Sequence, residues 1–296
     1  MKSGMISILG RPNTGKSTLF NALLGEKVSI VTDKPQTTRR RVCGALNIDG
    51  AQLVFIDTPG FHKPRTALGR YMSGTASESA GGVDCALLLV EPTPRVGTQE
   101  NLLIERVKSA GTPCVLAVNK VDTVPKEAIL PVIAEYVKAY DFAAVVPVSA
   151  ARKDGLDLLI NEMLQFLPEG PPLFPDGMVS DQTEMALVSE IVREKLLESL
   201  DLEIPHGIAV VVESMKERGE AENTLTEIHA MIYCEKDSHK GIIIGKNGAL
   251  LKRVGTAARL ELADMFGQKI ALKLWVKVRE NWRDDPSRLR AFGYWD

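Results

Sequence analysis

The sequence predicts an α/β domain with a mainly parallel sheet, followed by a smaller α+β domain. In the first part of the chain, continuous apolar runs of strand length alternate with segments of helical spacing, which is typical of a parallel sheet covered on both faces. The segment 168–181, PEGPPLFPDGMVSD, holds four prolines and two glycines and cannot continue a helix. Beyond it the predicted element order changes to α-β-β-α-α-β, and we find no internal repeat.

The first domain, 1–167, begins with an apolar strand at 5–9 and an amphipathic helix at 17–24 that Gly25 ends. The dipeptide Asp49-Gly50 is a strong hairpin signal between two strands. We expect a long functional loop at 26–41 and at best a weak helix within 61–82. The remaining strands and helices are predicted at 42–48, 51–56, 85–90, 100–109, 113–118, 126–140, 144–148 and 156–167. A ligand of such a sheet binds at the carboxyl ends of its strands.

The segment 168–181 is the predicted linker, and 182–296 is the predicted second domain with a C-terminal tail. A helix is expected at 183–200, strands at 208–214 and 225–234, a further helix ending near 266, and a last strand at 269–279. The tail from 280 carries aromatic residues among charges, namely Trp282, Tyr294 and Trp295. We expect this tail to dock on the second domain.

The charge is unevenly distributed along the chain. The formal net charge is -2, with 45% hydrophobic and 25% charged residues, which are globular values. From residue 236 to the end, 13 lysines and arginines stand against 7 aspartates and glutamates. A basic C-terminal part attached to an acidic N-terminal part indicates a nucleic-acid partner. On charge alone, an ordinary solvated basic face remains the alternative.

Cysteine usage and hydropathy indicate a cytoplasmic protein. The four cysteines, at 43, 85, 114 and 234, contain no C-x-x-C pair, and three of them lie in apolar runs. Buried thiols in a reducing compartment are therefore expected. No apolar stretch approaches the length of a membrane span, and the N-terminus lacks a signal peptide. The four histidines have no metal-ligand spacing, and we assign them no chemistry.

The stretch GRPNTGKS, residues 10–17, has the spacing of a phosphate-binding loop between a strand and a helix. Gly10 and Gly15 allow the tight turn that aims backbone N–H groups at an anion. Lys16 is expected to reach the β- and γ-phosphates, and the hydroxyl of Ser17 to bind Mg²⁺. The predicted nucleotide-binding residues of this loop are Gly10, Asn13, Thr14, Gly15, Lys16, Ser17 and Thr18.

The sequence Asp57-Thr58-Pro59-Gly60 stands at the end of a predicted strand. A carboxylate there can hold Mg²⁺, and the N–H of Gly60 can meet the γ-phosphate. Turns of the form D-x-x-G are common, so the pattern carries weight only because it follows a phosphate loop and a hairpin. All four residues are predicted to contact the nucleotide.

The sequence Asn119-Lys120-Val121-Asp122 decides which base is bound. Asp122 can accept hydrogen bonds from guanine N1–H and the exocyclic amino group, which adenine does not offer. Asn119 is expected to brace the neighbouring loops, and the stem of Lys120 to cover the base. Ser149-Ala150 completes the set, because a backbone N–H near Ala150 can bond the guanine carbonyl oxygen. The predicted ligand is GTP or GDP with Mg²⁺.

With these motifs, residues 1–167 resemble a translation-factor-class GTPase domain. The loop Pro35-Gln36-Thr37-Thr38-Arg39 is similar to the first switch of the Era family, in which a threonine completes the Mg²⁺ site. We therefore expect Thr38 to join Ser17 and Asp57 as metal ligands, with Thr37 as the weaker candidate. The stretch 60–75 is the expected second switch.

The resemblance leaves the hydrolysis machinery open. Phe61 stands where many small GTPases carry a water-orienting glutamine. Relatives with a hydrophobic residue there imply a water held by backbone groups, and some use the asparagine at the position of Asn13 to bind K⁺. The resulting hypothesis names Lys16, Asn13, Thr38 and Gly60 as the catalytic residues and predicts slow basal hydrolysis. A turn-forming Asn13 without K⁺ is the alternative.

The sequence Ile244-Gly245-Lys246-Asn247-Gly248 matches the G-x-x-G loop that clamps the nucleic-acid backbone in KH domains. The pattern is weak alone, but the element order around it is that of a type II KH domain. Lys252 and Arg253 follow one turn later and carry the positive charge that phosphates need. These two residues and the five of the loop are the predicted RNA-binding residues.

A P-loop GTPase domain followed by a KH domain closely resembles the Era family of bacterial GTPases over essentially the whole chain. The resemblance implies binding to 16S ribosomal RNA near its 3′ end, a role in assembly of the 30S subunit, and loose association with the inner membrane. We expect a monomer. One alternative remains at this point, an RNA-binding protein whose nucleotide domain is a GDP-filled scaffold without turnover.

Overall fold

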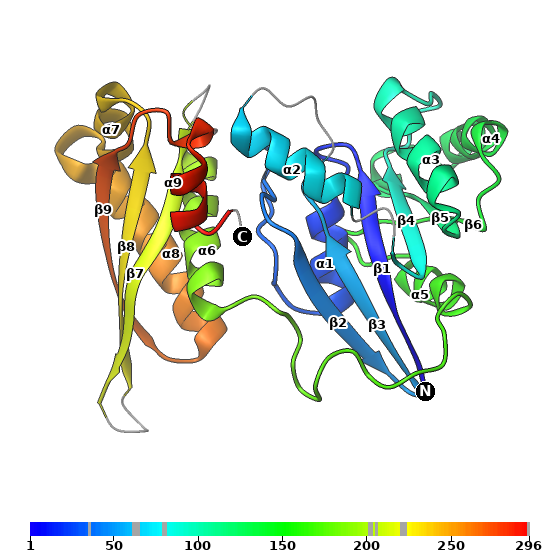
Figure 1. Cartoon of the computed structure of the whole chain (residues 1–296), viewed down its shortest axis with the longest axis horizontal. Helices are drawn as coiled ribbons and strands as arrows, with labels where there is room; N and C mark the ends of the chain where they lie inside the picture. Colours follow the sequence, from blue (N-terminus) through cyan, green and yellow to red (C-terminus); the bar gives the residue numbers. More distant parts are fainter. Residues whose placement is uncertain are drawn as a thin grey trace. The chain divides into compact units, whose positions relative to one another are not determined.

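The computed structural model describes residues 1–34, 37–60, 66–78, 82–200, 204, 207–219 and 224–294, without the side chains of 76–78. The chain divides into two compact units, the first made of residues 1–31, 38–65 and 69–181 and the second of residues 32–37, 66–68 and 182–296. Figure 1 shows their helices and strands coloured along the sequence.

Among the described residues, the first unit contains a six-stranded sheet with the order β2-β3-β1-β4-β5-β6. Strands β1, β3, β4, β5 and β6 are parallel, and β2 pairs antiparallel with β3 at the edge. The strands are β1 (Lys2–Gly10), β2 (Val42–Ile48), β3 (Ala51–Asp57), β4 (Cys85–Val90), β5 (Cys114–Val118) and β6 (Ala144–Pro147). The predicted parallel sheet and the hairpin at Asp49-Gly50 are confirmed.

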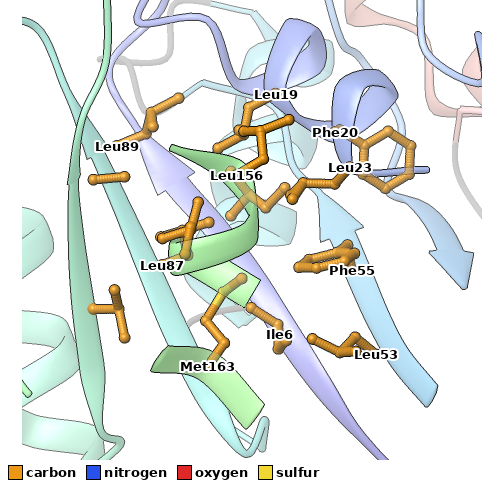
Figure 2. Close-up of a cluster of buried hydrophobic side chains, with 14 of the residues drawn as sticks. Ile6, Leu19, Phe20, Leu23, Leu53, Phe55, Leu87, Leu89, Leu156 and Met163 are labelled. Atoms are coloured by element: carbon orange, nitrogen blue, oxygen red, sulfur yellow. The ribbon is translucent and has the colours of Figure 1, made fainter. Parts of the chain in front are cut away.

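Helices cover both faces of this sheet, as continuous apolar strands require. Helices α1 (Lys16–Leu24) and α5 (Leu156–Leu164) bury Leu19, Phe20 and Met163 against one face, and Figure 2 shows these side chains over the strands. Helices α3 (Thr98–Ala110) and α4 (Ile129–Ala139) cover the other face with residues that include Leu103 and Tyr136. A short 3-10 turn, Lys126–Ala128, precedes α4.

The expectation of at best a weak helix within 61–82 is wrong, because α2 spans Ala67–Glu78. The segment is rich in Gly, Ser and Thr, which have low helix propensity. Leu68 and Met72 lie four residues apart on one face, and both are buried. Burial of this face therefore holds a helix that local propensity does not predict.

The proline-rich segment 168–181 runs along the first unit and is tied to it by hydrogen bonds. Ala45 N donates to Val179 O at 2.8 Å, and Cys43 N donates to the carboxylate of Asp181 at 2.9 Å. The buried amide of Gln52 donates to Phe174 O and accepts from Phe174 N. The segment thus satisfies polar groups at the open edge of β2. The domain limits 1–167 and 182–296 remain predictions.

The second unit combines three strands and three main helices within the described residues. Strands β7 (Ala209–Arg218) and β8 (Leu225–Cys234) pair antiparallel, and β9 (Lys269–Val278) pairs parallel with β8. Helices α6 (Glu184–Ser199) and α8 (Ala249–Phe266) pack on this sheet, while α7 (Asp237–Ile244) precedes the glycine loop. On β8 the residues Ile228, Ala230 and Ile232 alternate toward the helices and are fully buried.

The C-terminal tail docks on the second unit, as predicted. It forms a 3-10 turn, Trp282–Asp284, and a short helix, α9 (Pro286–Ala291). Trp282 is fully buried, and its indole N–H donates to Gly207 O at 3.0 Å. Phe292 stacks on Tyr233 of β8, with 4.5 Å between ring centroids. Trp295 lies outside the described residues.

Candidate functional site

The turn between β1 and α1 contains the predicted phosphate loop and has the backbone geometry that such a loop needs. Gly15 has φ of 95°, and a Cβ at this position would approach Asn119 Nδ2 to 2.4 Å. Asn13 also has positive φ, at 65°. The loop therefore closes tightly before α1 begins at Lys16, which leaves the first N–H groups of the helix directed at the turn.

Lys16 is held inside this loop. Its side chain is 6% exposed, and Nζ donates to Gly10 O at 3.1 Å and to Arg11 O at 2.6 Å. Burial lowers the pKa of Lys16 to about 8, although the charge of Asp57 opposes this shift. A buried ammonium group whose neutral carbonyl partners compensate it poorly is suited to receive an anion.

Three oxygen-bearing side chains from distant parts of the sequence meet beside Lys16. Ser17 Oγ lies 2.9 Å from Thr38 Oγ1 and donates to Asp57 Oδ2 at 2.9 Å. Thr38 Oγ1 also donates to the same carboxylate oxygen at 3.2 Å. The structure thus brings together the three residues predicted to bind Mg²⁺. Thr37, the weaker candidate, instead donates its hydroxyl to Lys34 O at 2.7 Å.

The burial of Asp57 and its unused carboxylate oxygen fit a divalent cation. Asp57 is fully buried, and its Oδ1 has no hydrogen-bond partner among the described residues. Burial raises the pKa of Asp57. The nearby charge of Lys16 and the hydroxyls of Ser17 and Thr38 act against this rise. A buried carboxylate with an unused oxygen, next to two hydroxyls, presents the hard oxygen donors that Mg²⁺ prefers.

The remaining predicted residues around the phosphate loop are also placed. Thr58 is buried and donates its hydroxyl to Ile8 O at 3.0 Å, and Thr14 donates to Arg11 O at 3.0 Å. Gly60 follows Pro59 and lies against Pro12, which a Cβ on Gly60 would approach to 3.1 Å. Thr18 lies in the first turn of α1. Phe61, Pro35 and Gln36 lie outside the described residues.

Asn119 braces two loops, as predicted. Its amide Nδ2 donates to Thr14 O at 2.8 Å, and its Oδ1 accepts from Ala150 N at 3.0 Å. The side chain is 2% exposed. Both bonds are buried, so Asn119 links the phosphate loop to the loop that follows β6. Because the N–H of Ala150 itself donates to Asn119, the N–H near Ala150 that is predicted to bond the guanine carbonyl oxygen belongs to a neighbouring residue.

Asp122 is oriented by its neighbours. Ser149 Oγ donates to Asp122 Oδ1 at 2.7 Å, and Arg152 Nε lies 3.5 Å from Oδ2. The hydrogen bond from Ser149 lowers the pKa of Asp122, and Arg152 acts in the same direction. Asp122 is therefore an ionised acceptor with a fixed direction, which selective recognition of two N–H donors requires.

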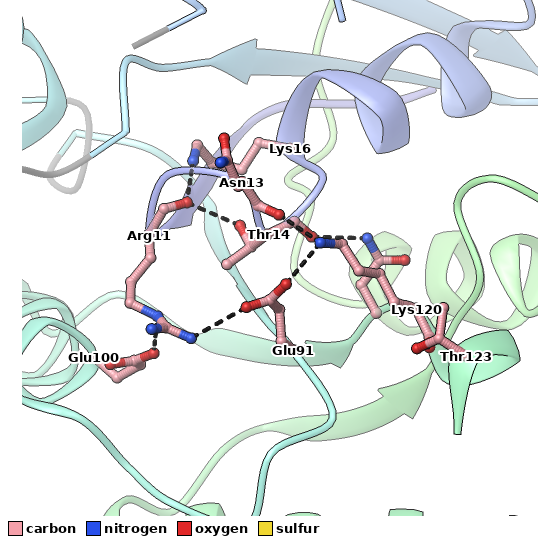
Figure 3. A network of polar contacts seen from close by, with 9 residues as sticks. Arg11, Asn13, Thr14, Lys16, Glu91, Glu100, Lys120 and Thr123 are labelled. Carbon is pink, nitrogen blue, oxygen red and sulfur yellow. Dashed lines mark hydrogen bonds and ion pairs between the residues drawn. The ribbon is translucent and has the colours of Figure 1, made fainter. Parts of the chain in front are cut away.

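No sequence motif marks four further charged residues of this site, which were therefore not predicted, namely Arg11, Glu91, Glu100 and Arg152. Figure 3 shows Arg11 and Lys120 on either side of Glu91. Glu91 directly follows β4, which lies between β1 and β5 in the sheet. Its position directly after a buried strand is the one signal in the sequence that could have indicated it. The strands that flank β4 are known only from the order of the sheet.

In the second unit, the loop Gly245 to Gly248 connects α7 to α8. Gly245 has φ of 73°, and a Cβ there would approach Leu250 Cβ to 2.8 Å, so this position requires glycine. Asn247 and Gly248 also have positive φ, at 53° and 76°. The loop lets another backbone approach closely at the N-terminus of the 18-residue helix α8.

Beside this loop lies an open groove of about 370 Å³ between α8 and β9. Its lining combines leucines and basic side chains with small residues and consists of Gly248, Leu251, Lys252, Gly255, Thr256, Arg259, Leu272 and Leu274. Lys252, one of the predicted RNA-binding residues, lines the groove, and so does Arg259, seven residues later on the same helix face, which the sequence did not indicate. Arg253 is exposed but does not line the groove, because the next helix position is rotated by about 100°.

The same two parts of the chain match known protein families. Residues 5–120 match the model of the 50S ribosome-binding GTPase family, and residues 203–283 match the KH domain model. The chain is 48% identical to GTPase Era of Ruminiclostridium cellulolyticum over 99% of this chain and 97% of that protein. GTPase Era of Clostridium perfringens is 47% identical over 99% of this chain and 98% of its own length. The chain belongs to the Era family of GTPases.

Solved structures of the Era family agree with the fold over the whole chain. A single-residue variant of Aquifex aeolicus Era bound to GDP·AlF4⁻ has a TM-score of 0.95 and 39% identity, with all of both chains covered. Era in complex with MgGDPNP and nucleotides 1506–1542 of 16S ribosomal RNA matches with the same values. The chain is thus a GTPase with a P-loop domain on a mainly parallel sheet and a C-terminal KH domain.

Two further expectations concern thiols and membranes. All four cysteines are buried free thiols, as predicted, and burial raises the pKa of Cys85 to about 12. Within the part of the chain that the structure describes, no helix is both long and apolar enough to cross a bilayer.

Proposed function

We propose that this Era-family GTPase is a molecular switch that binds 16S ribosomal RNA near its 3′ end and acts in 30S subunit assembly. The observation that carries the proposal is the convergence of Ser17, Thr38 and Asp57 beside the buried Lys16. Thr38 belongs to the loop expected to be the first switch. A loop residue that completes a metal site makes the conformation of that loop depend on what the site holds.

In this proposal each residue has a separate role in nucleotide binding. Lys16 leaves the carbonyls of Gly10 and Arg11 and donates to the phosphates, while Ser17, Thr38 and Asp57 hold Mg²⁺. Bound there, Mg²⁺ neutralises phosphate charge during hydrolysis. Asp122 accepts from the guanine base, and Asn119 keeps its loop against the phosphate loop. The N–H of Gly60 donates to the γ-phosphate and thereby links the second switch to GTP.

A single-turnover GTPase assay of the full chain, with and without an RNA of the 16S 3′ end, tests the switch. We expect slow hydrolysis alone and a change in rate when RNA is bound. No hydrolysis in either condition would instead support the GDP-filled scaffold, in which the KH domain acts without turnover.

Asn13 is our candidate for a K⁺ ligand that assists hydrolysis. It lies at the tip of the phosphate loop with positive φ, and its carbonyl accepts from Lys120. The backbone that carries the Asn13 side chain is therefore fixed in its conformation. Equal GTP turnover in K⁺ and Na⁺ buffers would rule out this role, and Asn13→Ala is expected to abolish a K⁺ effect without abolishing GDP binding.

The KH domain is proposed to bind a single strand of RNA in the groove beside the loop Gly245 to Gly248. Leu251, Leu272 and Leu274 offer an apolar floor for unstacked bases, and Lys252 and Arg259 offer positive charge for phosphates. Ile244 ends α7 at the start of the loop. The backbone approach at Gly245 and Gly248 accommodates the nucleotide chain.

We predict that replacing Lys246 and Asn247 with aspartate lowers RNA affinity of the full chain by about 10- to 100-fold at low salt. The new carboxylates repel the phosphates that the loop is expected to clamp, so the salt dependence should also become shallower. GDP affinity should remain unchanged. Titrations of a labelled 16S 3′-end RNA at several salt concentrations measure both effects, and unchanged RNA affinity would exclude this loop as the contact.

We also predict that GDP affinity falls at alkaline pH. With a pKa of about 8 in the free protein, Lys16 is mainly protonated at neutral pH, but it must take up a proton on binding phosphate above pH 8. The dissociation constant should then rise by up to about tenfold per pH unit between pH 8 and 10. Calorimetry of GDP binding at pH 9, in buffers of different ionisation enthalpy, would detect this uptake. A pH-independent affinity would contradict it.

The other assignments follow from the same proposal. We place the protein in the cytoplasm, with loose peripheral association to the inner membrane, and expect a monomer. The domain limits are proposed as 1–167 and 182–296 with 168–181 between them. Flotation with anionic vesicles and light scattering of the purified chain would test the membrane and monomer assignments.

A further inference from the structure

Glu91 emerges from the sheet between the two loops that are proposed to bind the nucleotide. It directly follows β4, and β4 lies between β1, which leads into the phosphate loop, and β5, which leads to Asn119. The register pairs Gly10 with Leu89 and Val118 with Val90. The order of the strands therefore places one carboxylate between Arg11 and Lys120.

Both oxygens of Glu91 are used. Oε1 accepts from Lys120 Nζ at 2.6 Å, and Oε2 accepts from Arg11 Nη2 at 3.3 Å (Figure 3). Lys120 Nζ also donates to Asn13 O at 2.6 Å. Arg11 is in turn anchored by Glu100, which is 2% exposed in the first turn of α3. A continuous chain of opposite charges thus joins the two loops.

We infer that Glu91 is a positioning residue that slows the release of guanine nucleotide by holding Lys120 and Arg11 together. The inference rests on the proposed nucleotide site, in which one loop holds the phosphates and the other holds the base. A ligand that spans both loops leaves when they separate, and Glu91 joins them without touching either end of the ligand. Without it, Lys120 Nζ keeps its bond to Asn13 O, and its long stem regains rotational freedom.

Two properties distinguish this role from base recognition and from general stability. Glu91 acts through Lys120, which contacts no exocyclic group of the base. Loss of Glu91 should therefore accelerate the release of GDP and of inosine diphosphate by the same factor. The side chains of Glu91 and Lys120 are 32% and 37% exposed, so added salt should weaken their ion pair. Nucleotide release from the wild-type chain should therefore accelerate with salt through this link.

The test is the dissociation rate of a fluorescent GDP from the full chain with Mg²⁺, measured for the wild type and Glu91→Gln. We expect release to accelerate about three- to tenfold, equally for the inosine analogue, with a weaker dependence on salt. Glu135→Gln is the matched control, since it removes one carboxylate from an exposed ion pair with Lys138 on α4. This control should release GDP at the wild-type rate.

A double-mutant cycle with Lys120→Met completes the experiment. If Glu91 acts through Lys120, Glu91→Gln should accelerate release much less in the Lys120→Met background than in the wild-type background. Multiplicative effects, or an unchanged rate in Glu91→Gln, would overturn the inference. A wild-type chain that binds GDP no better than inosine diphosphate would instead contradict the proposed reading of the base by Asp122. Unfolding of the nucleotide-free Glu91→Gln variant near the wild-type temperature excludes a general loss of structure.

Discussion

Lys16→Ala is expected to lower the affinity of the full chain for GDP and GTP by about 10²- to 10⁴-fold. The ammonium group is proposed to make charge-assisted hydrogen bonds to two phosphates, each worth about 1.5–3 kcal/mol. In the free protein the same group is buried, and its partners are the neutral carbonyls of Gly10 and Arg11. The substitution therefore removes phosphate-binding energy, and it also removes the positive charge that acts on the buried Asp57.

The Lys16→Ala prediction can be tested against a simple loss of structure. Because burial lowers the pKa of Lys16 to about 8, its charge is destabilised in the folded protein. Removing this charge relieves its desolvation but leaves the buried Asp57 without a cationic neighbour, so the two effects oppose each other and the nucleotide-free Lys16→Ala variant should unfold near the wild-type temperature. It should also retain its affinity for the 16S 3′-end RNA in the absence of nucleotide. Isothermal titration with GDP, with Lys138→Ala as a control at an exposed ion pair, measures the effect. Near-wild-type GDP affinity would contradict the phosphate role.

The parts of the fold and site that the sequence predicts correctly depend on strictly local requirements. A phosphate loop needs glycine at a fixed place, and the positive φ of Gly15 beside Asn119 shows why. A buried parallel strand needs an uninterrupted apolar run, and β4 begins and ends where it is predicted. Strand β8 also has its predicted limits, but its residues alternate between buried and partly exposed positions. Asp57 and Ser17 belong to motifs with fixed spacing, and their meeting at one edge of the sheet follows from the strand order.

The features that were missed depend on contacts between distant residues. Helix α2 forms although its composition disfavours it, because Leu68 and Met72 are buried. Glu91 belongs to no motif, and only the position of β4 between β1 and β5 gives it two cationic neighbours. The segment 168–181 reads as a linker from its prolines, yet it pairs with β2 and with the buried Gln52. Neither the composition nor the periodicity of the segment predicts these hydrogen bonds.

The choice of Thr38 over Thr37 as a metal ligand also could not be made from the spacing of residues in the sequence. Both are threonines in a loop without periodicity, so resemblance rather than spacing favours Thr38. The structure gives the physical difference, because Thr38 donates to Asp57, whereas Thr37 donates to the backbone of its own loop. A hydroxyl already engaged by its own turn is a poor metal ligand, and this engagement depends on the conformation of the loop.

Asp122→Asn is expected to exchange the preference of the site from guanine to xanthine nucleotides. The carboxylate is proposed to accept from two N–H groups of guanine, and a site that pairs buried donors and acceptors rejects an unpaired analogue by about 10⁴-fold. An asparagine at this position offers an N–H group to the C2 carbonyl oxygen of xanthine and leaves the guanine amino group facing another donor. GDP affinity should thus fall by roughly 10³- to 10⁴-fold, while xanthosine diphosphate becomes the better ligand.

The orientation of Asp122 makes this exchange a sharp test of the base site. Ser149 Oγ donates to Oδ1 at 2.7 Å and can retain that bond to the asparagine carbonyl, so the side chain should keep its direction. Competition between GDP and xanthosine diphosphate for the full chain measures the exchange, and Asp141→Asn, at an exposed position, controls for loss of one negative charge. If the variant lost GDP and gained no xanthine nucleotide, the role of Asp122 would be to hold Ser149 and Arg152. The guanine preference of this family member would then have to come from the backbone around Ala150.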